Sequence, residues 1–153
     1  MIKKAVILTY APVSNWEQEL LKSTKIFKLA LNHHAKEFAP NARIITDYVL
    51  MSISTKFHEK IITIRDRSKP QNDKIEYYAG EFKGATILSA IDYLKDKNYK
   101  EILIVGNNSV NNLKFRNLIN NEIEKIKNKI ILYQYSDGNF NLPIKSITEF
   151  LNN

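Results

Sequence analysis

The residues best suited to acid–base chemistry are two adjacent histidines, His33 and His34, which directly follow Asn32. A histidine titrates near neutral pH, so either one could accept a proton from a hydroxyl group as a general base. Successive side chains of an extended segment point in opposite directions, and no HxxxH spacing or acidic partner supplies further metal ligands. We therefore expect no metal ion here and treat His33 and His34 as candidate catalytic bases.

A second set of candidate residues offers hydroxyl, amide and carboxylate groups directly after short apolar runs. Hydroxyls can hold a phosphate, an amide can both donate to and accept from a nucleobase or a sugar, and a carboxylate accepts sugar hydroxyls. Each residue also has a structural alternative, as a turn, a loop cap or a helix cap. Both roles stay open for Thr9, Ser14, Asn32, Asp47, Asn107, Asn108 and Ser109, and the candidate site also includes Pro12 and Gly106, which offer no such side chain but shape the turns of the same loops.

The segment from Thr9 to Ser14 departs from known phosphate-binding loops. Such loops use glycines so that backbone N–H groups can approach the anion, but this segment has no glycine and Pro12 lacks an N–H donor. The chain also contains no GxGxxG, no Walker lysine loop and no Ser–His–Asp order. The residue types alone therefore do not define a reaction.

Alternating apolar runs and amphipathic stretches predict the elements that position these residues. The first predicted helix has Trp16, Leu20 and Leu21 at helical spacing, and Ser14 or Asn15 can cap it. The predicted strands are Lys4–Tyr10, Lys25–Leu31, Arg43–Thr46, Lys60–Ile64, Ile75–Tyr78, Glu101–Val105 and Lys129–Tyr135. The predicted helices are Asn15–Lys22, Asp47–Thr55, Gly84–Asp96, Val110–Lys127 and Ser146–Leu151, and Arg65–Asp73 is predicted as a loop.

Strands that alternate with helices favour an α/β fold with a mostly parallel sheet and helices on both faces. In such a sheet, ligands bind beyond the carboxyl ends of the strands, near the point where the strand order reverses. The chain has 153 residues, of which 44% are hydrophobic, and we expect residues 1–153 to form a single domain.

The composition excludes several protein classes. The chain has no cysteine, so it has no disulfide, no thiolate nucleophile and no cysteine-bound zinc. No apolar run approaches the ~18 residues of a membrane span, and the apolar stretch near the N-terminus is too short for a signal peptide. We expect a cytoplasmic protein without a resident cofactor; the sequence leaves the oligomeric state open.

The net charge of +7 is compatible with a polyanionic partner. The lysines are scattered, however, at intervals typical of solvated helix faces; Lys22, Lys25, Lys28 and Lys36 are examples. Aromatic residues are not interleaved with a basic stripe, as single-strand binders require. The pattern therefore argues against nucleic acid as a partner.

Several segments resemble one family in the same order along the chain. Gly84-Ala85-Thr86 opens an apolar helix, and the run from Asn98 to Gly106 follows it. Together with the tail from Lys129 to Leu151, these segments resemble bacterial lipooligosaccharide sialyltransferases and the related motility accessory factor glycosyltransferases. Upstream, Lys4–Leu8, Pro12 and Phe27–Asn32 are similar to the first strand, the phosphate loop and the asparagine-ended strand of that family.

The resemblance implies a three-layer Rossmann-like fold and a cleft for a CMP-sugar or another nucleotide. It implies that Thr9–Ser14 face the phosphate and that Asn32 faces the nucleotide or the sugar. Lys83 and Gly84 would line the donor site, and Gly106–Ser109 would lie on the ribose or base side.

The chain departs from this family where catalysis is concerned. The family's glycine-containing phosphate loop survives only as Pro12, and the chain passes from Ser109 into the next helix without the family's tyrosine-bearing lid and histidine. A transferase without a lid does not exclude water from a reactive donor. We therefore expect a sugar-nucleotide-binding, sialyltransferase-like domain with reduced or no activity; the alternative is a non-enzymatic module that binds a nucleotide, another small molecule or a protein.

Overall fold

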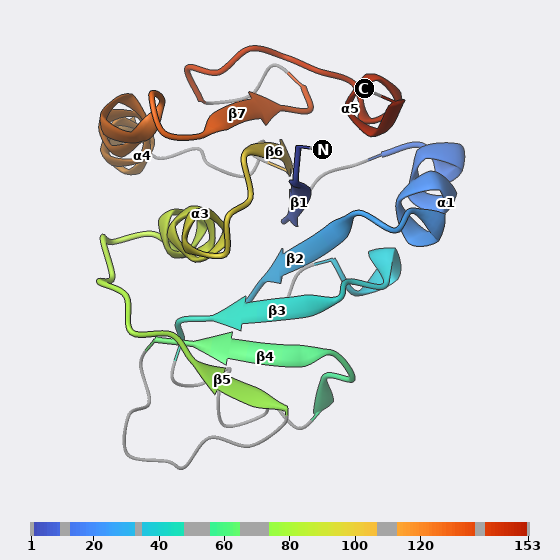
Figure 1. Cartoon of the computed structure of the whole chain (residues 1–153), viewed down its shortest axis with the longest axis horizontal. Coiled ribbons are helices and arrows are strands. Elements are labelled where there is room, and N and C mark those ends of the chain that lie inside the picture. Colours follow the sequence, from blue (N-terminus) through green and yellow to red (C-terminus); the bar gives the residue numbers. More distant parts are fainter. Residues whose placement is uncertain are drawn as a thin grey trace.

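Seven parallel strands form one sheet in the order β5-β4-β3-β2-β1-β6-β7 (Figure 1). The computed structural model describes residues 2–9, 13–32, 35–47, 56–64, 74–106, 113–136 and 140–152. The strands are β1 (Lys4–Leu8), β2 (Phe27–Leu31), β3 (Ala42–Ile45), β4 (Lys60–Thr63), β5 (Ile75–Tyr77), β6 (Glu101–Val105) and β7 (Ile131–Gln134).

β1 and β6 are neighbouring inner strands of the sheet, and after their first residues their side chains are apolar on both faces. Ile7 lies opposite Ile104, and both are completely buried. A strand covered on both faces needs a continuous apolar run rather than an alternating one, which is the pattern of these two segments. This pair therefore marks the core of the molecule.

Helices cover both faces of the sheet. α3 (Thr86–Asp96) and α4 (Leu113–Ile126) lie on one face, and α1 (Asn15–Ser23) and α5 (Ile147–Asn152) lie on the other (Figure 1). A short 3-10 turn, η1 (Lys36–Phe38), packs beside α1. Within the described ranges, no helix combines the length and the apolar character that crossing a membrane requires.

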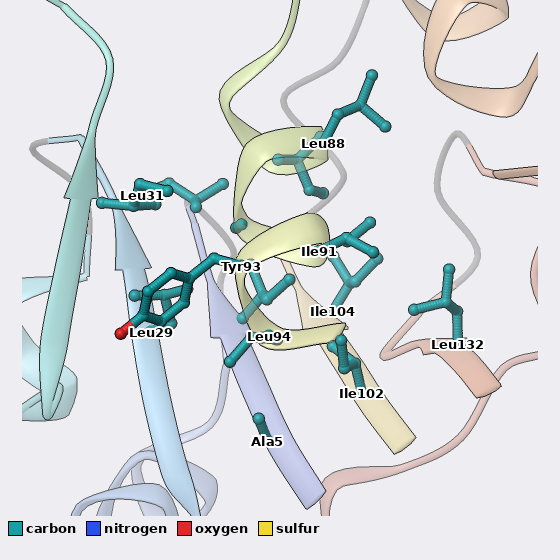
Figure 2. Close-up of a cluster of buried hydrophobic side chains, with 14 of the residues drawn as sticks. Ala5, Leu29, Leu31, Leu88, Ile91, Tyr93, Leu94, Ile102, Ile104 and Leu132 are labelled. Carbon is teal, nitrogen blue, oxygen red and sulfur yellow. The ribbon is translucent and has the colours of Figure 1, made fainter. Parts of the chain in front are cut away.

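α3 packs its apolar stripe against the middle of the sheet (Figure 2). Leu88, Ile91 and Leu94 recur at helical spacing and are buried against Ala5 of β1 and Ile104 of β6. The spacing of these three residues in the sequence is what allows one helix face to cover two strands.

The order of the strands reverses beside β1. Strands β1 to β5 are added one after another on one side, and the connection through α3 then carries the chain back to β6 on the other side of β1. This arrangement is a three-layer Rossmann-like α/β fold, which confirms the predicted fold class. The seven predicted strands and the helices beginning near Asn15, Gly84 and Ser146 are confirmed, with ends shifted by up to two residues. The helix predicted from Val110 is confirmed over Leu113–Ile126, and its predicted start lies outside the described residues.

The expectation that Lys28 lies on a solvated helix face is wrong. Lys28 lies on β2, and it is only 3% exposed. Its Nζ donates to the carbonyl oxygens of Leu21 (2.8 Å), Lys22 (3.4 Å) and Thr24 (3.4 Å) at the end of α1. Burial lowers the pKa of Lys28. The ammonium group satisfies carbonyls that a helix end otherwise leaves without donors.

Two further lysines, one directly before β1 and one at its start, also donate to carbonyl oxygens at helix ends. Lys3 Nζ donates to the carbonyl oxygen of Lys97 after α3 (2.9 Å), and Lys4 Nζ donates to that of Phe150 in α5 (3.0 Å). In a parallel sheet the helices end at the amino edge, so lysines at the starts of strands meet helix carboxyl ends. Lys3, Lys4 and Lys28 therefore place part of the positive charge of the chain against the carboxyl ends of helices.

We expect Leu94→Ala to lower the free energy of unfolding by about 2–5 kcal/mol, because it leaves a cavity under α3 where Leu94 is completely buried. Leu113→Ala is the matched control, since Leu113 on α4 is 64% exposed, and we expect a change within about 0.5 kcal/mol. Urea unfolding followed by circular dichroism measures both. Equal losses for the two variants would contradict the packing described above.

Candidate functional site

The carboxyl ends of β1 and β6 lie side by side at the reversal of strand order. The backbone N–H of Thr9 donates to the carbonyl oxygen of Val105 (2.9 Å), and Gly106 turns the chain away with a φ of 113°. The chain after β1 leads to α1 on one face, whereas the chain after β6 leads to α4 on the other face. Diverging connections at such a point are where parallel α/β sheets bind ligands.

Some candidates from the sequence lie outside the described residues. These are Pro12, His33, His34, Asn107, Asn108 and Ser109. Most of the expected helix Asp47–Thr55 and the expected loop Arg65–Asp73 fall there too, apart from the exposed Asp47 at the end of β3. Thr9 and Gly106 are the two candidates that the structure brings together at the β1–β6 pair.

Asn32 joins three elements at the carboxyl edge. It adopts a φ of 49°, its Nδ2 donates to Thr86 Oγ1 (3.1 Å), and its Oδ1 accepts from the backbone N–H of Thr46 (3.2 Å). The hydroxyls of Thr46 and Thr86 are 2.7 Å apart. The side chain thus has the geometry of a loop cap that fixes the ends of β2 and β3 to the start of α3. An amide has two N–H donors, and within the described ranges Thr86 is the one acceptor for Asn32 Nδ2.

Arg43 holds the backbone of Asn32 in place, and it was not among the residues predicted from the sequence. Arg43 on β3 is completely buried, its Nη1 donates to the carbonyl oxygen of Asn32 (2.9 Å), and its Nε donates to Glu59 Oε1. Its guanidinium also lies 4.5 Å from the centre of the Phe57 ring. A lone arginine inside an apolar strand is the signal that could have identified this buried ion pair.

Ser14 caps α1 and is engaged by an acidic residue that sequence analysis missed. Ser14 Oγ donates to Glu17 Oε1 (2.7 Å), and the backbone N–H of Glu17 donates to Ser14 Oγ (3.4 Å), which completes a capping box. Tyr135, beyond β7, also donates its hydroxyl to Glu17 Oε1 (2.9 Å). The Ser-x-x-Glu spacing could have identified Glu17, whereas the contact with Tyr135 depends on the fold.

The start of α1 is therefore negatively charged and unsuited to an anion. The Glu17 carboxylate stands in the first turn, where it interacts favourably with the helix dipole and repels a phosphate. Burial and the neighbouring Glu17 raise the pKa of Tyr135 to about 12. The hydroxyl of Tyr135 thus stays protonated as a donor to Glu17 across the neutral range.

The start of α3 differs from that of α1. Its N-cap residue, Ala85, has no side-chain acceptor, and the first turn contains no acidic residue. Gly84 precedes it with a φ of 95°, and a Cβ on Gly84 would lie 2.9 Å from Leu118 Cδ2. This end of the sheet therefore keeps backbone N–H groups of α3 without a side-chain cap.

Lys83 is already paired within the protein. Its Nζ lies 3.1 Å from Asp92 Oδ2 and 3.9 Å from Glu122 Oε2. Although burial alone would lower the pKa of Lys83, its hydrogen bond to Asp92 and the charges of both carboxylates raise it. The structure thus places Lys83 near the start of α3, with its charge balanced by α3 and α4.

The described residues contain no cluster of three histidine, aspartate or glutamate side chains that could hold a metal ion. No family model, no curated protein and no solved structure matches this chain.

Substitutions of Asn32 separate its backbone role from its side-chain role. We expect Asn32→Gly to lower the free energy of unfolding by about 1–2 kcal/mol, because the bonds to Thr46 and Thr86 are lost while glycine tolerates the positive φ. Asn32→Ala should cost about 1 kcal/mol more, since alanine is strained there. Chemical denaturation measures both, and an alanine variant as stable as the glycine variant would contradict the role of the positive φ.

The raised pKa of Tyr135 predicts a pH dependence. The unfolded phenol ionises near pH 10 and the folded one near pH 12, so its contribution to stability is present below pH 10 and is lost as the pH rises to about 12. Tyr135→Phe removes the hydrogen bond to Glu17 and should cost about 1 kcal/mol at neutral pH. The free-energy gap between wild type and variant should narrow above pH 10 in urea unfolding series. A gap that stays constant would contradict the assignment.

Proposed function

We propose that this protein binds a nucleotide or nucleotide sugar, of the cytidine type, at the carboxyl edge of its sheet, with reduced or no glycosyl transfer activity. The observation that carries the proposal is the reversal of strand order between β1 and β6 in a fully parallel sheet. The two connections diverge there to opposite faces, and ligands of parallel α/β proteins bind in the space between such connections.

The polar groups at this edge suit the parts of a nucleotide. The start of α3 supports a phosphate, because backbone N–H groups there lack a side-chain cap and no acidic residue stands in the first turn. Asn32 adds an amide N–H beside Thr86, at the same end of α3. The resemblance of the segments around Gly84 and Gly106 to sialyltransferases favours cytidine as the base.

The charge balance argues against efficient transfer. Departure of a nucleotide from a sugar needs groups that stabilise the phosphate charge that develops. Lys83, the basic residue next to Gly84, is held by Asp92 and Glu122. The sequence also lacks a glycine phosphate loop, which would stabilise the charge on the departing phosphate. It lacks a tyrosine-bearing lid as well, which would exclude water from the donor.

A second candidate function is binding of an apolar small molecule or a protein surface away from this edge. A hollow of 210 Å³ lies between the end of α4 and the start of β7. Its lining is mostly apolar and comprises Ile123, Lys127, Ile130, Ile131, Leu132, Asn141, Leu142 and Pro143. Ile131 is 45% exposed, which favours a non-enzymatic binding module.

Thermal unfolding with added nucleotides tests the proposed function. A ligand present at about 100 times its dissociation constant adds about 2.7 kcal/mol to stability, which raises the melting temperature of a chain of this size by about 5–10 °C. We expect this shift with CMP and a smaller one with GMP. No shift with any nucleotide at millimolar concentration would overturn the proposal and leave the apolar hollow as the better candidate.

A transfer assay with a CMP-sugar donor tests the expected loss of activity. We expect the purified protein to bind the donor without transferring the sugar at a rate above that of donor hydrolysis. The control is the pair His33→Ala and His34→Ala, which should leave CMP binding unchanged. Rapid transfer that either substitution abolishes would show that the protein is an active transferase with a histidine base.

A further inference from the structure

Trp16 is exposed at the carboxyl edge of the sheet. It lies in the first turn of α1, directly after the connection from β1, and it is 62% exposed. Its spacing from Leu20 and Leu21 suggests the buried side of the helix, but of these residues only Leu21 is completely buried. Exposure of a large indole to water is unfavourable, and tryptophans with one accessible face are typical of binding surfaces.

The next residue, Glu17, has a carboxylate that is fixed on one side and open on the other. Oε1 accepts from Ser14 Oγ (2.7 Å), from the backbone N–H of Ser14 (3.3 Å) and from Tyr135 OH (2.9 Å). In the part of the chain that the structure describes, no donor lies on Oε2. A carboxylate oxygen held in place in this way is a strong acceptor for a hydroxyl or N–H group.

The same carboxylate determines which part of a nucleotide can lie here. Its negative charge repels a phosphate, and the Ser14 hydroxyl already accepts the N–H of Glu17. A ribose or another sugar ring fits instead, because its hydroxyls donate to a carboxylate and its apolar face packs on an indole. A cytidine would also offer its base to the indole.

We infer that Trp16 and Glu17 form the subsite for the nucleoside part of the ligand, with Trp16 packing on a ring and Glu17 accepting a sugar hydroxyl. The inference rests on the proposed function and deepens it: the phosphate lies away from α1, and the uncharged nucleoside lies against it. The subsite should therefore bind cytidine as well as CMP and should not respond to inorganic phosphate.

Trp16 is the single tryptophan of the chain, so its fluorescence reports directly on this subsite. We expect both cytidine and CMP to change the emission of the wild-type protein, CMP at the lower concentration because its phosphate also meets the start of α3, and inorganic phosphate alone to leave the emission unchanged. Binding measured by calorimetry should weaken about tenfold in Trp16→Ala, as for other aromatic residues that stack on bases. Thermal unfolding of each variant without ligand verifies that it is folded.

Glu17→Gln removes the charge while keeping a residue that is compatible with the capping box. We expect it to weaken cytidine binding about tenfold, as loss of a hydrogen bond to a charged group does. Glu19→Gln is the matched control, because it removes one negative charge from the same helix at an exposed position beside Lys22. This control should bind cytidine like the wild type.

The outcomes separate this inference from the proposed function. If CMP stabilises the protein while Trp16 emission and binding to Trp16→Ala are unchanged, the subsite is wrong and the proposed function stands. If no nucleotide stabilises the protein or changes the emission, both are wrong. A change of emission with inorganic phosphate alone would also overturn the subsite. So would equal losses of cytidine affinity in Glu17→Gln and Glu19→Gln. Emission that depends on protein concentration alone would overturn it in favour of a contact between copies of the chain.

Discussion

The pairing of β1 with β6 is the constraint on which the rest of the structure depends. β1 has β2 on its other side, so the backbone groups of a completely buried strand are satisfied only when both neighbours are in place. The same pairing forces the chain to cross back over the sheet through α3, and it brings Thr9 beside Val105. The core and the location of the candidate site thus have one physical cause.

The elements of the fold could be predicted because their signals are local. The apolar run of β6 and the helical spacing of Leu88, Ile91 and Leu94 each depend on a few neighbouring residues. The strand order could not be derived in this way, since it depends on which buried edges meet. Likewise, the sequence alone predicts a surface position for Lys28, because the contact between the end of α1 and β2 that buries it depends on the fold.

The placement of Asn32, Thr9 and Gly106 at the ends of strands was predictable, whereas the residues that contact Asn32 were not. Asn32 was selected as an amide at the end of a strand, and the structure shows what holds it: Arg43, Thr46 and Thr86 come from segments that the sequence separates. Glu17 was missed, although its position three residues after Ser14 is typical of the helix-capping residue that it is. The hydrogen bond from Tyr135 to Glu17 could not be predicted, because it depends on the position of β7 beside α1 in the fold.

The position of β1 between β2 and β6 also has a consequence for biosynthesis. β1 is synthesised well before β6, and the partner of Ala5 on one side is Ile102 of β6. Until then β1 exposes an apolar strand with one unpaired edge, which is the kind of segment that associates with other chains. Contacts so distant in sequence also slow folding, because a long loop must close before they are formed. During that period the nascent chain is prone to association through β1, and pairing with β6 ends it.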